Sequence, residues 1–94
     1  MSYALDITPE AEARLARLIE LLPPARRGAA LDAVLTQLTT LAANPRLAVP
    51  AAVGRPVYRF SFVAEDTTYY WAATFRYSLD ERAIVVTDVF RTQL

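Results

Sequence analysis

The sequence contains no cysteine, histidine or lysine among its 94 residues. Without cysteine there is no disulfide framework and no cysteine nucleophile. Without histidine the chain lacks the commonest metal ligand and the commonest general base near neutral pH. Every cationic side chain is an arginine, whose guanidinium stays charged and cannot accept a proton. We therefore expect no metal and no cofactor, and only tyrosine and carboxyl groups remain for proton transfer.

The sequence also lacks long apolar runs and an excess of charge. No stretch approaches the ~18 continuous apolar residues of a membrane-spanning helix, and the first residues do not resemble a secretory signal. We therefore expect a cytoplasmic protein that contacts no membrane. Ten arginines balance ten acidic residues. A net charge of zero argues against nucleic-acid binding by bulk electrostatics alone.

Glycine is scarce as well, with two residues against 54% hydrophobic residues. This composition and length predict a single domain over residues 1–94. The hydrophobic share lies slightly above the usual ~45–50%. The excess indicates either a dense core or a face that a partner completes.

Two helices are predicted in the first half of the chain. Thr8 is an N-cap ahead of Pro9, and apolar residues recur at helical spacing to residue 22, with Glu10 and Arg14 as solvent-side i,i+4 partners. A pair of prolines then ends this helix, and a second runs over residues 25–43. Its predicted buried stripe comprises Leu31, Leu35, Leu38 and Leu41 or Ala42. Asn44 is expected to end it in a left-handed conformation before a proline. The short connection predicts an antiparallel helical hairpin.

Alternating apolar and polar residues predict strands over residues 3–7, 57–63, 69–77 and 83–91. Charged turns at residues 65–66 and 80–81 separate the last three strands, and residues 44–56 form a loop with three prolines. The fold class is therefore α+β, in the order β-α-α-β-β-β. The helical hairpin should pack on a small antiparallel sheet.

Tight turns would also set the strand register. Phe62 would lie opposite Tyr69, Phe60 opposite Trp71, and Phe75 opposite Val86, forming one aromatic face beneath the helices. The aromatic set Tyr58, Phe60, Trp71 and Phe75 is interpreted as core and not as a platform for stacking bases. The opposite face would carry the following residues: Arg59, Ser61, Tyr70, Thr74, Arg76, Thr87 and Arg91. Arg91 would lie opposite Tyr70. Asp88 would fall on the buried face, either as a structural hydrogen-bonding group or as a site acid.

The sequence stretches "ITPEAEARLARL", "LAANP", "GRPVYRFSF" and "YYWAATFRYSLDERAIVVTDVFR" resemble the RelE/ParE superfamily of bacterial toxins. The resemblance extends over nearly the whole chain. It implies the toxin of a type II toxin–antitoxin system, encoded on a chromosome or a plasmid, with a cognate antitoxin as partner. Some members inhibit DNA gyrase, whereas others cut mRNA in the ribosomal A site. In the cutting branch the active surface is a sheet face with basic residues and often a C-terminal tyrosine.

Carried over residue by residue, the resemblance matches Arg59 in "YRF" and Arg91 in "VFR" to family arginines. No tyrosine follows Arg91. The neutral charge and the missing acid/base residues favour a toxin that binds and inhibits a target such as DNA gyrase. The alternatives are a ribosome-dependent mRNA endonuclease and a non-toxic interaction module of the same fold. The sequence leaves open whether the protein is an enzyme, and whether it forms a homodimer or a hetero-oligomer with its antitoxin.

The candidate target- or phosphate-binding residues are Arg59, Arg76, Arg91 and Tyr70. Guanidinium groups can bind phosphate, and a tyrosine beside an arginine can have its pKa lowered enough to transfer a proton. Two other interpretations of the arginines stay open: a solvated sheet face, and a contact surface for the antitoxin.

Overall fold

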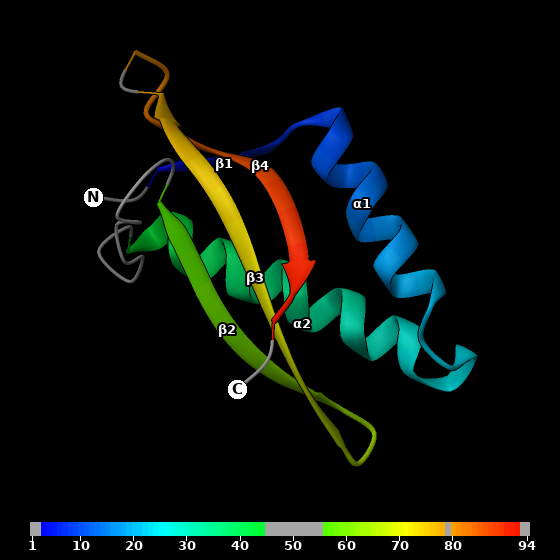
Figure 1. The fold of residues 1–94 in the computed structure, drawn as a ribbon. Helices are drawn as coiled ribbons and strands as arrows, with labels where there is room; N and C mark the ends of the chain where they lie inside the picture. The colour runs from blue at the N-terminus through cyan, green and yellow to red at the C-terminus, as the bar shows by residue number, and fades with distance from the viewer. Residues whose placement is uncertain (1–2, 45–55, 79, 93–94) are drawn as a thin grey trace.

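The computed structural model describes residues 3–44, 56–78 and 80–92 and has an α+β fold (Figure 1). Strand β1 (Ala4–Ile7) is followed by helices α1 (Pro9–Glu20) and α2 (Pro24–Ala43). Strands β2 (Val57–Ala64), β3 (Thr67–Ser78) and β4 (Ala83–Arg91) complete the fold. The predicted fold class and element order are confirmed. Most of the predicted loop over residues 44–56 lies outside the described residues.

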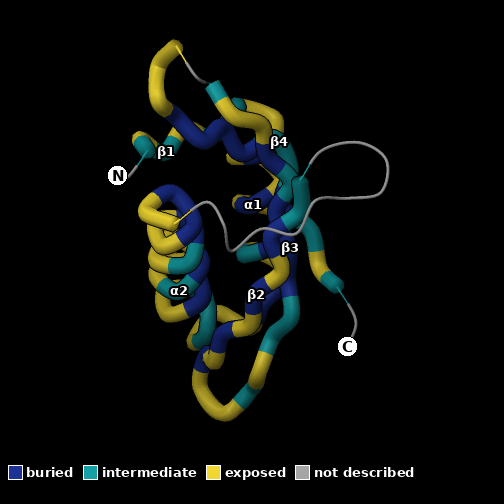
Figure 2. The backbone as a smooth tube through the Cα atoms, turned by 90° about the vertical axis from the view of Figure 1, so that its left-hand side faces the viewer, coloured by how far each residue is buried: buried dark blue, intermediate teal, exposed yellow. Residues whose placement is uncertain are grey.

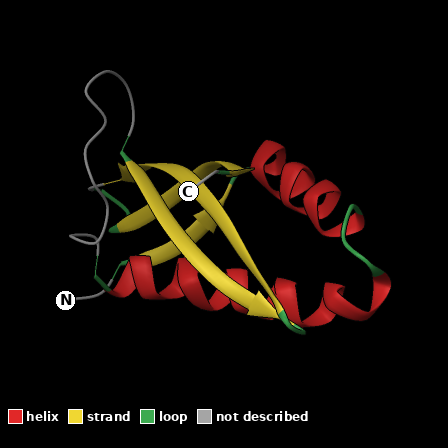
Figure 3. Cartoon of the chain, turned by 60° about the horizontal axis from the view of Figure 1, so that its bottom comes forward, coloured by secondary structure: helices red, strands yellow, loops and turns green. Residues whose placement is uncertain are grey.

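Helix α1 begins as its sequence predicts, because the Thr8 hydroxyl accepts a hydrogen bond from the Ala11 amide at 3.1 Å. The short connection to α2 is held by Arg27. Its Nε donates to the Leu22 carbonyl at 3.1 Å and its Nη2 to the Glu20 carbonyl at 2.9 Å. A guanidinium therefore binds carbonyls that lack partners at the end of α1. From this connection the two helices diverge, and both reach the same sheet (Figure 3).

The sheet has the strand order β1-β4-β3-β2. The pairs β2–β3 and β3–β4 are antiparallel, as predicted, whereas β1 pairs with β4 in parallel. The predicted pairs Phe62–Tyr69, Phe60–Trp71 and Phe75–Val86 are all present. A two-residue turn at residues 65–66 sets the register of β2 on β3, and Glu65 adopts φ 55° there.

The core lies between the helices and one face of the sheet, and Figure 2 shows the buried side of α2 turned toward the strands. The predicted aromatic set is buried: Tyr58, Phe60, Trp71 and Phe75. Phe62 contacts Trp71 edge to face, with ring centroids 4.9 Å apart. Neither described helix is long and apolar enough to cross a membrane.

Two predictions for α2 are wrong. Leu31 and Leu35 are each 38% exposed, because the buried stripe runs one residue earlier. That stripe comprises Ala30, Val34, Leu38, Leu41 and Ala42. Both stripes are apolar, so the pattern alone cannot distinguish them. Asn44 ends the helix with φ −143° instead of a left-handed conformation, and its amide bonds the carbonyls of Thr40 and Leu41.

Candidate functional site

The sheet face that turns away from the helices is called the outer face below. Because directly paired residues point to the same side of a sheet, the register defines its members. They are Ala4, Asp6, Val57, Arg59, Ser61, Val63, Thr68, Tyr70, Ala72, Thr74, Arg76, Ser78, Ala83, Val85, Asp88 and Phe90. Thr87 joins them, since its hydroxyl lies 3.0 Å from the Thr74 hydroxyl. This face combines hydroxyl groups, arginines, two carboxylates and apolar side chains.

Arg59 and Tyr70 lie near each other on this face. Arg59 pairs with Ala72, and Tyr70 is two positions from Ala72 on β3 and pairs with Ser61. Such diagonal neighbours are about 7–8 Å apart, within reach of long side chains. Arg59 is exposed and Tyr70 is half-buried. The structure therefore brings a guanidinium and a phenol hydroxyl to one part of the outer face.

Arg76 is on the same face but stands apart from that pair. It pairs with Val85 and lies four positions along β3 from Ala72. At about 3.3 Å per residue, its backbone is roughly 13 Å from the row that contains Arg59. One phosphate group cannot bridge both guanidinium groups without a large side-chain excursion.

The prediction that Arg91 lies opposite Tyr70 is wrong. Arg91 pairs with Trp71, and the Thr92 amide donates to the Tyr70 carbonyl at 2.8 Å. The cause is a register shift between Thr74 and Phe75, where β4 contributes one extra residue. Since Trp71 belongs to the core, the register places Arg91 on the helix side of the sheet end.

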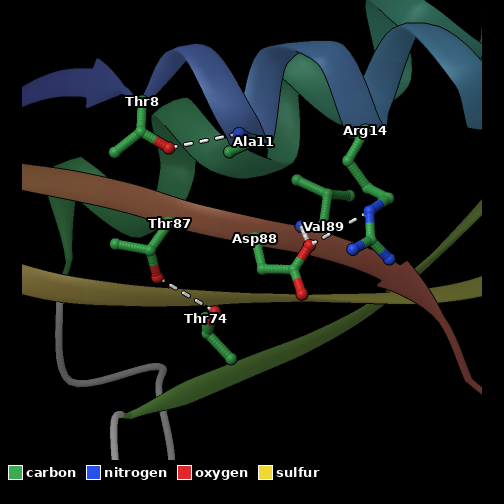
Figure 4. Close-up of polar contacts among 7 residues, drawn as sticks. All are labelled: Thr8, Ala11, Arg14, Thr74, Thr87, Asp88 and Val89. Atoms are coloured by element: carbon green, nitrogen blue, oxygen red, sulfur yellow. Dashed lines mark hydrogen bonds and ion pairs between the residues drawn. The ribbon is translucent and has the colours of Figure 1, made fainter.

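The same bulge moves Asp88 off the buried face. Asp88 now pairs with Thr74 on the outer face, and its side chain is 39% exposed. One carboxylate oxygen accepts from the Val89 amide at 2.9 Å and lies 3.8 Å from Nε of Arg14 (Figure 4). The Tyr58 hydroxyl donates to Oε1 of Gln37 at 2.7 Å and not to Asp88.

Arg14 is a residue of this region that the sequence did not indicate. Helix α1 lies beside the second half of β4, so its arginine reaches the rim of the outer face (Figure 4). A shallow hollow beside it is lined by Glu10, Ala13, Arg14 and Arg17. The sequence predicted Glu10, one helical turn away, as the partner of Arg14. Only the packing of α1 against β4 reveals Asp88 as the partner.

The two arginines of α2, Arg26 and Arg27, have structural roles. Arg26 donates from Nη1 to the Tyr69 hydroxyl at 3.0 Å, and Arg27 bonds the end of α1. These bonds fix both guanidinium groups against the fold and away from the outer face. In residues 3–44, 56–78 and 80–92, no group of three or more acidic side chains is placed to hold a metal ion.

Burial affects one titratable group in this part of the molecule. Tyr58 is packed under α2, and desolvation raises the pKa of its phenol above the usual 10.0. This hydroxyl therefore stays protonated at neutral pH. It lies on the core side of β2 and does not contribute to the outer face.

No protein-family model matches the chain, and no curated protein sequence matches it significantly. Solved structures do. The chain is 20% identical to one in the toxin–antitoxin complex RelBE2 from Mycobacterium tuberculosis, with a TM-score of 0.71 over 98% of this chain and 93% of that chain.

Two structures from E. coli are also similar. The first is a mutant of the toxin RelE in the free state, with 16% identity, a TM-score of 0.57, and coverage of 97% of this chain and 84% of that chain. The second is the intact RelBE toxin–antitoxin complex, with 12% identity, a TM-score of 0.51, and coverage of 99% of this chain and 100% of that chain. The chain therefore has the RelE-like fold that its sequence resemblance predicted.

Proposed function

We propose that the protein is the toxin of a type II toxin–antitoxin system, neutralised by a cognate antitoxin. The observation that carries this proposal is the likeness, over 97–99% of the chain, to three solved structures that contain RelE or RelBE proteins. Two of these structures are toxin–antitoxin complexes. The sequence resemblance, which extends over nearly the whole chain, supports the same class.

The proposed target is mRNA on the ribosome, bound on the outer face. Cleavage of RNA by its own 2′-hydroxyl needs a base, a cation for the charge on phosphorus, and an acid for the leaving oxygen. Arg59 would bind the phosphate through charge-assisted hydrogen bonds, and the nearby Tyr70 hydroxyl would donate to it. Asp88 offers a carboxylate two strands away. These groups are too dispersed to form a complete site, so the ribosome would have to position the RNA.

Inhibition of DNA gyrase is the second candidate. It is favoured by the zero net charge and by the separation of Arg59 from Arg76 and Arg91. A toxin that only binds its target requires no proton-transferring groups.

Growth assays in bacteria test the proposal. We expect expression of the chain alone to arrest growth, and co-expression of the antitoxin to restore it. Arg59→Ala should weaken the arrest, because a charge-assisted contact of about 1.5–3 kcal/mol corresponds to a roughly ten- to hundredfold loss of affinity. Arg91→Ala is the matched control, since that exposed arginine lies on the other side of the sheet.

Two in vitro readouts separate the targets at matched levels of soluble protein. Ribosome-dependent cleavage of mRNA that is lost in Arg59→Ala supports the endonuclease. Inhibition of DNA supercoiling without mRNA cleavage would instead select gyrase. Unimpaired growth at high soluble expression would refute the toxin assignment and leave an interaction module.

A further inference from the structure

Strand β2 lies at one edge of the described sheet, so half of its backbone amides and carbonyls point away from β3. The Phe75 amide donates to the Pro56 carbonyl at 3.3 Å, which assigns the even-numbered residues of β2 to the hydrogen-bonded pairs with β3. The amides and carbonyls of the odd-numbered residues therefore point away from β3. They belong to Val57, Arg59, Ser61 and Val63. Consistently, the Ser61 carbonyl accepts a long bond of 3.4 Å from the Gln37 side chain.

This edge carries few of the features that protect an edge strand, apart from the charge of Arg59 and the Gln37 side chain at the Ser61 carbonyl. Natural sheets block their edges with proline, lysine, bulges or a covering segment. Strand β2 contains neither proline nor lysine, and its register with β3 has no shift. Val63 is 61% exposed. Within residues 3–44, 56–78 and 80–92 no further strand pairs with β2.

We propose that this edge binds a second copy of the chain, with the two β2 strands antiparallel and Ser61 opposite Ser61 of the second copy. In this register the odd-numbered residues exchange hydrogen bonds. Arg59 then lies opposite Val63 of the second copy. On the helix side, Phe60 lies opposite Phe62 of the second copy, which continues the aromatic row across the interface. The product is one continuous eight-stranded sheet, in which the outer faces of the two copies lie on the same side.

The charges of β2 and of the turn after it favour a second copy as the partner and an antiparallel orientation of the two strands. Arg59 lies in the first half of the strand, whereas Glu65 and Asp66 occupy the turn after it. Antiparallel pairing places Glu65 of the second copy diagonally across from Arg59, at about 7–8 Å between backbones. Parallel, in-register pairing would instead place Arg59 beside Arg59 of the second copy and Glu65 beside Glu65 of the second copy. The aliphatic stem of Arg59 would also cover the exposed Val63 of the second copy.

Charge substitutions at Val63 test the proposal directly. Val63→Arg places a guanidinium opposite Arg59 of the second copy, whereas Val63→Glu places a carboxylate there. Both introduce a charge at the same exposed position, so each controls for the effect of the other on folding. Each pair occurs twice in a symmetric dimer. We expect the dissociation constants of the two variants to differ about tenfold or more, with Val63→Arg the weaker.

The measurement is sedimentation equilibrium of the full chain over a range of concentrations, with circular dichroism to confirm folding. We expect the parent to be a dimer that Val63→Arg weakens, and we expect Arg59→Glu combined with Val63→Arg to restore it. Amide exchange at Arg59, Ser61 and Val63 should slow as concentration rises. A parent that stays monomeric, or equal dissociation constants for the two Val63 variants, would overturn the proposal. A Val63→Arg variant that dimerises like the parent but no longer binds the antitoxin would also overturn the proposal, because the edge would then bind a strand of the antitoxin and not a second copy.

Discussion

Replacement of Trp71 by alanine tests how the core is built. Trp71 is 1% exposed and lies under the helices, in edge contact with Phe62. A buried indole removes roughly 150–250 Å² from water, which at about 25 cal/mol per Å² corresponds to ~4–6 kcal/mol. Measured truncations of large buried aromatics fall at about 3–5 kcal/mol.

One feature of the site lowers the expected loss. The indole Nε1 is buried without a hydrogen-bond partner, and an unsatisfied buried donor costs about 1–3 kcal/mol. Alanine removes that penalty together with the ring. We therefore expect Trp71→Ala to lower the free energy of unfolding by about 3 kcal/mol. A chain of this size has a total of only ~5–14 kcal/mol.

Trp71→Phe is the matched control, because it keeps an aromatic ring against Phe62 and removes only the unpaired N–H and part of the ring. Its loss should be clearly smaller than that of alanine. The assay is urea unfolding followed by circular dichroism, since Trp71 is the only tryptophan and fluorescence would lose its probe. A loss below about 1 kcal/mol for alanine at an unchanged m-value would refute the core assignment. Equal losses for the two variants would refute the contribution given to the aromatic ring packed against Phe62.

Three further perturbations have defined outcomes. Tyr58 has a raised pKa, so its contribution to stability is constant below pH 10 and is lost as pH rises through the folded-state pKa. Tyr58→Phe should therefore remove the fall in the free energy of unfolding at alkaline pH. At neutral pH it should cost about 0.5–1.5 kcal/mol, because the hydrogen bond to Gln37 is lost. Thr8→Ala should cost about 1 kcal/mol in the same assay because the N-cap of α1 is lost, and Thr8→Ser should recover most of it. Arg14→Ala should change stability by less than about 0.5 kcal/mol, since its pair with Asp88 is long and largely exposed; a larger loss in thermal unfolding would show that the pair holds α1 to the sheet.

The sequence predicted the elements of this fold because each boundary has a local cause. Thr8 and Pro9 begin α1, a pair of prolines separates the helices, and the turn at residues 65–66 sets the pairing of β2 with β3. That turn also predicted correctly that Arg59 shares a face with Tyr70. These features depend on residues close together in the chain.

The rest of the candidate site depends on a bulge that no local residue indicates. The register shift between Thr74 and Phe75 contains neither glycine nor proline, so the pattern of β4 looks uninterrupted. The predicted faces of the residues beyond it are reversed as a result, among them Asp88, which was expected in the core, and Arg91, which was expected on the outer face. The pairing of Arg14 with Asp88 was also missed, because it joins two elements far apart in the sequence.

The parallel pairing of β1 with β4 has a consequence for folding. Residues 4–7 form hydrogen bonds with residues 83–86, whereas both helices lie between them in the chain. A growing polypeptide can form its helical hairpin early, but β1 has no strand to join until β4 has been synthesised. The two central strands, β3 and β4, are also the last to be made. Contacts between distant parts of a chain slow folding, so we expect the outer face to assemble only late and in one cooperative step.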